Sequence, residues 1–291
     1  VCPVLNVADD RLPQKVLAAK NKNEQIRNTS SSGGIFTILA EQVINDGGVV
    51  FGVKFNDKWE VVHSYTETID GLAAFRGSKY VQSFIGNSFK ETETFLKQGR
   101  KVLFSGTPCQ IAGLRGYLRR DYDNLITVDI ICHGVPSPQI WNDYLVYIEN
   151  KYGKIKKAYF RDKRKGWNVQ KETFQCNKEH SFITFKKLFY SHICLRHSCY
   201  NCQFTSYDRC SDITISDFWG WEKISDKFSD NKGVSLAIIN TGKGLSLFTS
   251  IEKGHFTQEV NKEDCSQPQL NHPAKYNPKR ETFELDYKEK G

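Results

Sequence analysis

The chain has 291 residues, of which 39% are hydrophobic and 25% are charged, a composition typical of a globular protein with a sizeable core. No apolar run approaches the roughly 20 residues of a membrane span, and the net charge of +8 is spread along a chain without a nucleic-acid-binding motif. Nine cysteines, an odd number, exclude a fully paired disulfide framework and favour metal-bound or catalytic thiols in a reducing cytoplasm.

The first third of the chain predicts a linker followed by alternating helices and strands. Residues 1–28 are polar with few apolar residues, and we expect a linker there. Cys2 and Pro3 match the last two residues of the bacterial ferredoxin cysteine run. Hydrophobic periodicity then predicts a helix within 30–46, a hairpin of strands 47–55 and 59–65, a loop over 73–83 and a helix over 87–99.

The middle of the chain predicts a parallel unit. Strands 100–106 and 125–132 alternate with helices 107–120 and 137–153, and each helix has Pro at its first position after Thr107 or Ser137. Short antiparallel strands follow at 155–163, 172–179 and 181–187, then strands within 211–221 and 232–241, a helix over 242–254 and a polar tail from Cys265. The predicted fold is α/β, a mixed sheet with a parallel βαβα core and an antiparallel, cysteine-containing C-terminal part.

Four cysteines are expected to meet. Cys199 and Cys202 form a CxxC, Cys109 lies in the first turn of a helix after a strand, and Cys132 ends the next strand. If these strands are parallel, both single thiols lie at the carboxyl edge of the sheet, where α/β sheets bind ligands. Four thiolates suit zinc or an iron–sulfur cluster, and the looser spacing suits a cluster better. Cys194 and Cys210 are spare candidates.

Three loops of small residues indicate a cofactor beside these thiols. Residues 31–34, Ser31, Ser32, Gly33 and Gly34, offer free N–H groups before a helix. Residues 76–80, Arg76, Gly77, Ser78, Lys79 and Tyr80, combine cations, a hydroxyl and an aromatic ring that suit an anionic planar cofactor, and Thr107 belongs to the third loop. His133 is a weak candidate for proton transfer, although a structural histidine is the simpler interpretation.

Taken together, the ordered motifs resemble the coenzyme F420 hydrogenase/dehydrogenase beta-subunit family. They are "SSSGGIFTILAEQVI", "GGVVFGVKF", "RGSKYVQS", "VLFSGTPCQIAGL", "DIICHGVPSP", "LRHSCYNCQF" and "SDITISDFWG", and the resemblance covers about residues 29–255. It implies an iron–sulfur flavoprotein with FAD and a [4Fe–4S] cluster. One departure is His197, where the family usually has Pro.

The resemblance also implies roles for particular residues. Cys109, Cys132, Cys199 and Cys202 would be the cluster ligands, and the flavin would lie against residues 31–34 and 76–80 near Thr107. Residues 1–28 would be the remnant of a linker after a ferredoxin-like module that ends at Cys2-Pro3. Residues 29–105 would form a flavin-binding part, 106–264 an iron–sulfur and flavin part, and 265–291 a surface tail.

We therefore expect a flavin-dependent oxidoreductase that passes electrons between the cluster or a ferredoxin-type carrier and a small organic substrate. The alternative is a non-redox binding domain in which the same four thiolates hold a structural zinc ion. A nucleic-acid binder rests only on the basic charge and is the weakest interpretation. The expected partners are thus a ferredoxin-like module or protein and a small organic substrate.

Overall fold

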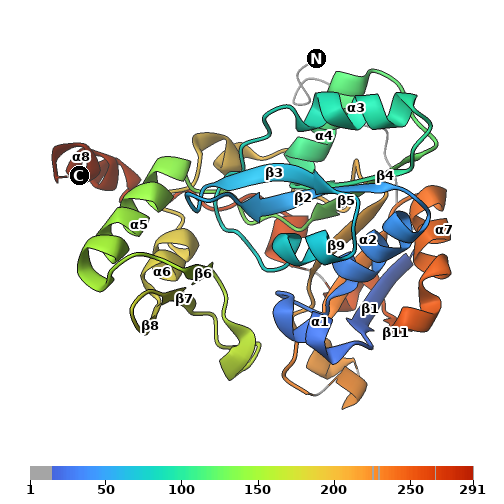
Figure 1. The fold of residues 1–291 in the computed structure, drawn as a ribbon. Helices are drawn as coiled ribbons and strands as arrows, with labels where there is room; N and C mark the ends of the chain where they lie inside the picture. Colours follow the sequence, from blue (N-terminus) through green and yellow to red (C-terminus); the bar gives the residue numbers. More distant parts are fainter. Residues whose placement is uncertain (1–14, 225, 229, 266, 291) are drawn as a thin grey trace.

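The computed structural model describes residues 15–224, 226–228, 230–265 and 267–290. Figure 1 shows a large sheet with helices on both faces, and beside it a smaller lobe that contains α5 and α6. Cys2 and Pro3, and with them the expected ferredoxin remnant, lie outside the described residues.

Within the described residues, eight strands form the large mixed sheet. β2, β4, β5 and β9 are parallel to one another, whereas β3 and the strands beyond β9 pair antiparallel. In spatial order the strands are β11 (His255–Glu259), β1 (Lys15–Asn21), β10 (Ser235–Ile239), β9 (Ile213–Asp217), β5 (Leu125–Ile130), β4 (Val102–Gly106), β2 (Val49–Phe55) and β3 (Val61–Thr66). The expected mixed α/β fold with a parallel core is confirmed.

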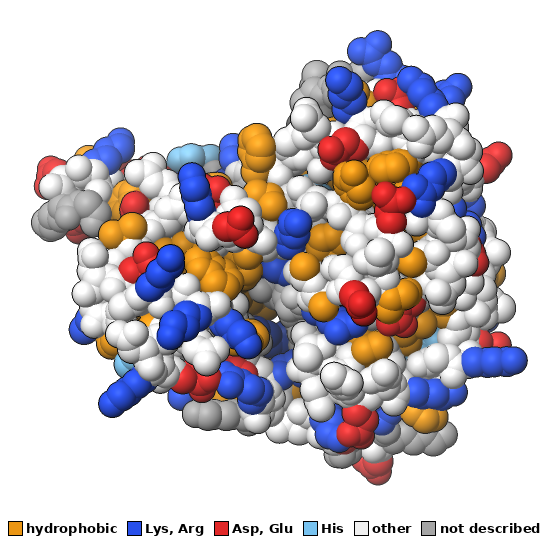
Figure 2. Space-filling model, in the orientation of Figure 1, with side chains coloured by type: hydrophobic (Ala, Val, Ile, Leu, Met, Phe, Trp, Pro, Cys, Tyr) orange, Lys and Arg blue, Asp and Glu red, His pale blue; other side chains and the backbone are white. Residues whose placement is uncertain are grey.

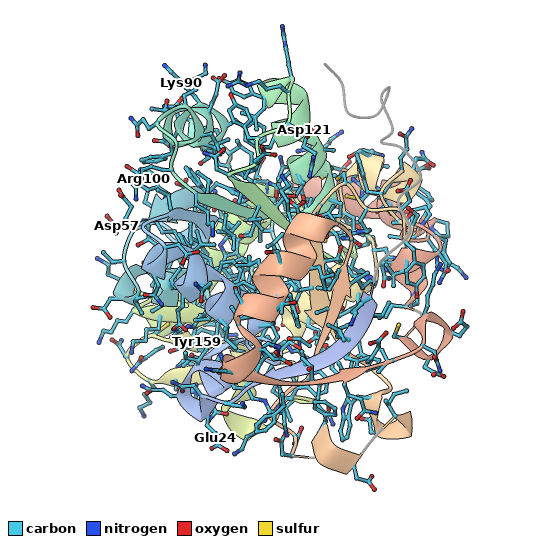
Figure 3. The ribbon with its side chains drawn as sticks, turned by 90° about the vertical axis from the view of Figure 1, so that its right-hand side faces the viewer. Glu24, Asp57, Lys90, Arg100, Asp121 and Tyr159 are labelled. Atoms are coloured by element: carbon cyan, nitrogen blue, oxygen red, sulfur yellow. The ribbon has the colours of Figure 1, made fainter. Side chains whose placement is uncertain are left out.

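Alternation along each buried strand places a hydrophobic core on both faces of the sheet. In β4, Leu103 packs under α2 (Ile35–Asn45) and α7 (Gly242–Ser250), whereas Val102 and Phe104 pack under α3 (Ser88–Lys97) and α4 (Pro108–Leu118). Because helices cover both faces, these strands are apolar on both sides. The charged residues Asp57, Lys90, Arg100 and Asp121 lie at the periphery (Figure 3), which agrees with a solvated, dispersed charge.

The smaller lobe is built on aromatic packing. It contains α5 (Pro138–Tyr152), α6 (Thr184–Tyr190) and the antiparallel sheet of β6 (Lys157–Tyr159), β7 (Glu172–Gln175) and β8 (Glu179–Phe182). Trp141 is its centre: the ring lies 4.2 Å from Phe160 and 5.2 Å from Phe185, centroid to centroid. Large rings bury much apolar area each, so a small sheet and two helices suffice for a stable core.

Three local expectations differ from the structure. Residues 15–28 are not a linker, because β1 pairs with β10 and β11 inside the large sheet and α1 (Glu24–Thr29) follows it. The last of the short strands, expected over 181–187, ends at Phe182 and gives way to α6. The tail is more ordered than expected, since Cys265 and Leu270 are buried in a core cluster and α8 (Arg280–Lys290) ends it.

Two glycines in the first turn of α7 provide a test of how tightly this helix packs. A Cβ atom on Gly244 would lie 2.3 Å from the carbonyl oxygen of Asp212, whereas one on Gly242 would meet nothing within 4 Å. We expect Gly244→Ala to lower the free energy of unfolding by about 1–3 kcal/mol through overpacking, as measured by chemical denaturation. Gly242→Ala is the matched control and should be neutral; equal effects of the two would contradict this packing.

Candidate functional site

The carboxyl ends of β4 and β5 present the first two cysteines. β4 ends at Gly106, and Thr107 begins α4 as its N-cap, with its N–H donating to Gln110 Oε1 at 2.9 Å. Cys109 therefore lies exposed in the first helical turn, 3.2 Å from Thr107 Oγ1. Cys132 follows the end of β5 two residues later. The expectation that both thiols lie at one sheet edge follows directly from the parallel pairing of β4 with β5.

The CxxC loop is held over this edge by its own backbone. Leu195 forms an isolated bridge with Pro136, and the N–H of Arg196 donates to Val135 O at 2.9 Å. A Cβ atom on Gly134 would lie 3.3 Å from the Cβ of Cys199, so the two segments approach closely here. Gly134 has a φ of +118°, a conformation that L side chains rarely adopt.

The four predicted cysteine ligands lie close enough to one another for their charges to interact. Each pair among Cys109, Cys132, Cys199 and Cys202 has a repulsive interaction between its thiolates. Burial raises the pKa of Cys132 to about 12, and the neighbouring thiols contribute to this rise. Burial also raises the pKa of Cys199 and Cys202. Four thiolates would therefore coexist here only with a compensating cation.

The donor set fits an iron–sulfur cluster. Four cysteine sulfurs are the usual ligands of a [4Fe–4S] cluster, and they also suit zinc. Among the residues that the structure describes, no group of three or more His, Cys, Asp or Glu side chains is arranged to hold a single metal ion. Four cysteine thiolates are chemically suited to either group.

The other described cysteines have separate surroundings. Cys194 is buried and its thiol donates to Leu188 O, while Cys210 donates to Pro108 O, each at 3.5 Å. Cys176 and Cys265 belong to hydrophobic clusters. Burial is the main cause that raises their pKa values.

Arg209 was not predicted, although it fixes the chain that follows the CxxC. Its guanidinium bonds Asp129 Oδ2 at 2.9 Å and Ile130 O at 2.8 Å on β5, and donates to Phe204 O at 2.9 Å. Both charged side chains are almost fully buried. No sequence motif marks this pair, because the two residues are 80 positions apart and meet only in the fold.

His133 sits in a histidine pair rather than facing open solvent. Its Nε2 lies 2.6 Å from Nε2 of His192, and its Nδ1 lies 2.7 Å from the amide nitrogen of Gln269. Burial, and then the charge of His192, lowers the pKa of His133 to about 4. These contacts give the residue a structural role, and its role in proton transfer stays a prediction.

The two loops predicted to hold the flavin meet directly. The hydroxyl of Ser31 accepts from the backbone N–H of Ser78 at 2.5 Å and bonds the Ser78 hydroxyl at 2.7 Å. Gly34 has a φ of +81° at the N-cap of α2, and a Cβ on Gly33 would lie 2.5 Å from Ala19 O, so neither position suits a larger residue. Arg76 donates to Thr37, a residue of α2.

Cations gather beside these loops. Lys79 donates to Ala74 O and Arg76 O, and burial lowers its pKa to about 7. Lys163, which was not predicted, donates to Ser32 O at 2.9 Å and Arg27 O at 2.8 Å. Burial, followed by repulsion from Arg27 and Arg161, lowers the pKa of Lys163 to about 7. The basic run at 156–167 is the sequence signal that contains it.

The same run supplies Arg161, which joins the small lobe to the end of β9. Its side chain forms a buried ion pair with Asp217 and donates to Trp167 O. Trp167 stacks on Trp219 at 4.4 Å between ring centroids, and the guanidinium lies over the Trp219 ring. In Figure 2 a hollow separates the lobe from the large sheet, with Lys and Arg side chains in its walls.

A hydrogen-bonded chain that includes His63 supports the start of α4. His63 Nε2 lies 3.1 Å from Ser105 O, a carbonyl that only accepts, so Nδ1 accepts from the Ser83 hydroxyl at 2.9 Å. Ser83 Oγ in turn accepts from the amide of Gln110, which also accepts from Thr107 N–H. Burial lowers the pKa of His63 to about 4.

The buried imidazole predicts a pH dependence of stability. Below pH 6.5 the unfolded chain binds a proton at His63, while the folded chain does so only near pH 4, so stability falls as the pH drops through this window. The loss is at most about 3 kcal/mol. In urea titrations at several pH values, His63→Gln should flatten this part of the profile, whereas exposed His272→Gln should not. An unchanged slope in the first variant would contradict the buried neutral state.

Comparisons with known proteins identify the relatives of this arrangement. Two family models of coenzyme F420 hydrogenase/dehydrogenase match: residues 16–88 match the one for the N terminus of the beta subunit, and residues 99–264 the one for its C terminus. A chain of the xenon-derivatised F420-reducing [NiFe] hydrogenase complex from Methanosarcina barkeri has a similar fold, with a TM-score of 0.61 and 17% identity over 87% of this chain and 84% of that one. No curated protein matches significantly.

Proposed function

Because the chain belongs to the coenzyme F420 hydrogenase/dehydrogenase beta-subunit family, we propose that it is an iron–sulfur flavoprotein. Membership, expected from the motifs and confirmed by both matches, indicates an oxidoreductase role. The finer proposal is electron exchange between a ferredoxin-like module or protein and a small organic substrate. The observation that carries it is the convergence of four thiols at the sheet edge, together with the direct contact between the loops 31–34 and 76–80.

In this proposal the chain holds and orients two cofactors. Cys109, Cys132, Cys199 and Cys202 would bind a [4Fe–4S] cluster, and the two loops would hold FAD. When bound, the flavin would supply two-electron exchange with the substrate, and the cluster one-electron transfer. The protein contributes positions, charges and exclusion of water rather than a nucleophile.

The residues around the loops suit the anionic groups of a flavin dinucleotide. Gly33 and Gly34 let this loop pack closely against Ala19 and Asn21, and the hydroxyls of Ser31 and Ser32 lie in the same loop. Lys79 and Lys163 donate only to backbone carbonyls here. Because burial lowers both pKa values to about 7, a bound phosphate or ring oxygen would favour the protonated form of each amine and gain a charge-assisted hydrogen bond from it. Among the described helices, none is long and apolar enough to span a bilayer.

Iron content tests the cluster. After reconstitution with iron and sulfide without oxygen, we expect about four irons per chain and broad visible absorption. Cys202→Ala should lose most of this iron, because three remaining thiolates hold a cluster weakly. Cys176→Ala, which changes a cysteine inside the core of the small lobe, is the control. Retention of iron by the first variant would exclude Cys202 as a ligand, whereas one zinc and no iron in the wild type would refute the cluster and favour a structural zinc site.

The affinity for FAD tests the role of Lys163 beside the loop 31–34. Lys163→Met should weaken FAD binding about tenfold, the effect of losing roughly 1.4 kcal/mol of charge-assisted bonding. Quenching of FAD fluorescence on titration with protein measures this affinity. Lys157→Met, an exposed change on β6, should leave it unchanged. If the two variants bind FAD equally well, Lys163 has no part in holding the flavin.

A further inference from the structure

The chain segments around the four thiols contain no acidic side chain. Three of them contain the candidate ligands, and the fourth bonds to two of the others through Gln82 and Ser83. All of their formally charged side chains are Lys or Arg, although the whole chain has 33 acidic residues. A surface of one sign attracts a partner of the opposite sign. The segments are residues 71–90, 100–120, 130–142 and 181–207.

Cys109 is the candidate ligand that reaches the surface. It is exposed in the first turn of α4, whereas Cys132, Cys199 and Cys202 are half-buried. Asp129, the acidic residue that precedes Cys132 on β5, is fully buried against Arg209 and adds no negative charge to the surface. A protein that exchanges electrons with this site therefore has its most direct approach at Cys109.

Phe84 is an exposed aromatic residue close to this thiol. It is 73% exposed, more than any other large hydrophobic residue in the described part of the chain. The hydroxyl of the preceding residue, Ser83, accepts a hydrogen bond at 2.9 Å from Gln110, the residue after Cys109. Single exposed hydrophobic residues are common on protein surfaces, but an aromatic ring beside an accessible candidate ligand is the type of residue that dominates the binding energy of protein interfaces.

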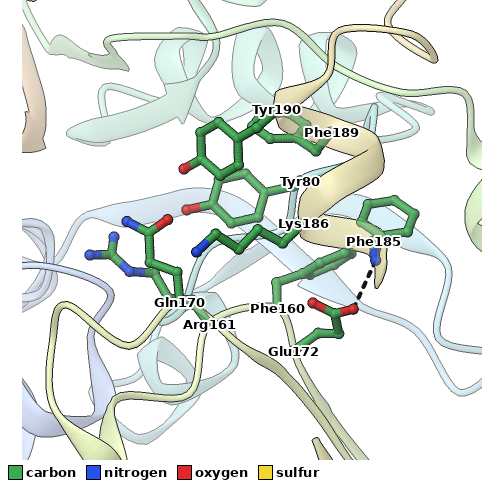
Figure 4. Close-up of a pocket in the computed structure, with 9 residues that line it drawn as sticks. All are labelled: Tyr80, Phe160, Arg161, Gln170, Glu172, Phe185, Lys186, Phe189 and Tyr190. Atoms are coloured by element: carbon green, nitrogen blue, oxygen red, sulfur yellow. Dashed lines mark hydrogen bonds between the residues drawn. The ribbon is translucent and has the colours of Figure 1, made fainter. Parts of the chain in front are cut away.

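The backbone that carries Phe84 is held on both sides. Before it, Tyr80 packs into the small lobe, where its ring lies 4.9 Å from that of Phe189, centroid to centroid, as Figure 4 shows. At Phe84 itself, the N–H donates to Val61 O and the carbonyl accepts from the N–H of His63, each at 2.9 Å. Because the backbone is already fixed, a partner that contacts Phe84 loses little affinity to ordering it.

An exposed cation lies beside the same segment. The guanidinium of Arg196 donates to Gln82, a neutral residue two positions before Phe84, and its positive charge also acts on the Cys199 thiol. Among the described residues no carboxylate forms an ion pair with Arg196, and Glu284 of α8 is paired with Arg280 at 2.7 Å. Arg196 can therefore bind a carboxylate of a partner protein.

We propose that the Phe84 face, formed by Phe84, Arg196 and the exposed Cys109, is the docking surface for a small acidic iron–sulfur protein of the ferredoxin type. The inference rests on the proposed function, because it assigns the place where the electron carrier of that function binds. Contacts between electron-transfer proteins are small, so one aromatic residue in basic surroundings suffices. In each encounter the carrier loses one electron that the cluster of this chain gains, or the reverse, and no bond or proton is transferred.

A plant-type [2Fe–2S] ferredoxin is the probe, because it is small and acidic. With the reconstituted chain, biolayer interferometry should show binding at roughly micromolar concentration in about 20 mM salt, and at least about tenfold weaker binding in about 200 mM salt. Phe84→Ala should weaken binding about tenfold. Arg196→Gln should weaken it about threefold and make it less dependent on salt. The controls Phe256→Ala and Lys253→Gln change exposed residues at β11, the opposite edge of the large sheet from β3, and should bind as the wild type does.

The outcomes separate the two proposals. No binding of ferredoxin, binding that salt does not weaken, or equal affinities of Phe84→Ala and Phe256→Ala would overturn the docking surface, while the iron content of the same sample decides the cluster independently. A wild-type dimer that Phe84→Ala dissociates would make this face a contact between two copies of the chain and would also overturn it. If the chain holds zinc and no iron but still binds ferredoxin in a Phe84-dependent manner, the iron–sulfur proposal fails while the docking surface stands.

Discussion

The buried ion pair between Asp129 and Arg209 is the contact on which the cysteine site depends. Asp129 lies on β5 just before Cys132, and Arg209 follows the CxxC loop, so the pair joins the two halves of the four-thiol group. Arg209 also bonds the carbonyls of Ile130 and Phe204. Breaking such a pair by removing one partner costs about 3–5 kcal/mol because a charge is left buried. The pair therefore ties the chain that follows the CxxC to β5.

Buried arginines join distant segments elsewhere in the same way. Arg27 bonds Asp230 and Gly233 O, and so fastens the segment before residues 31–34 to the start of β10. Arg161 connects the small lobe with Asp217 at the end of β9, and Arg280 of α8 bonds Tyr200 and Leu195 O beside the CxxC. The planar guanidinium suits this role because it reaches a carboxylate and carbonyls at once. Each loop of the candidate site is held by a partner far away in sequence.

These constraints explain how one edge of the sheet would hold the two proposed cofactors. Parallel pairing aligns the ends of β4, β5 and β9, so the turns after them face the same space. The thiols gather beyond β5, whereas Ser31, Ser78 and Lys163 gather toward the lobe. The chemistry proposed for the chain follows from this neighbourhood of four thiols with two loops that have lysines beside them.

Local patterns in the sequence determined the parallel core of the fold and the four candidate cysteine ligands. The βαβα unit, the Thr-Pro and Ser-Pro helix starts and the family motifs follow from periodicity and capping, which depend on residues close in the chain. They also indicated Cys109, Cys132, Cys199 and Cys202 as one group. The strand at Lys15–Asn21 was missed because its two alanines and flanking lysines have low strand preference, and only pairing with β10 and β11 stabilises it.

Only the tertiary structure decided which charges are buried together. The contacts of Arg209 with Asp129, of Lys163 with Ser32 and of Arg161 with Asp217 join residues that no local pattern relates. Burial also decides protonation: the pKa of Lys163 falls to about 7 and that of His63 to about 4 because the fold removes water from them. The sequence alone specified the donor groups, and the three-dimensional packing determined which of them could act on a common ligand.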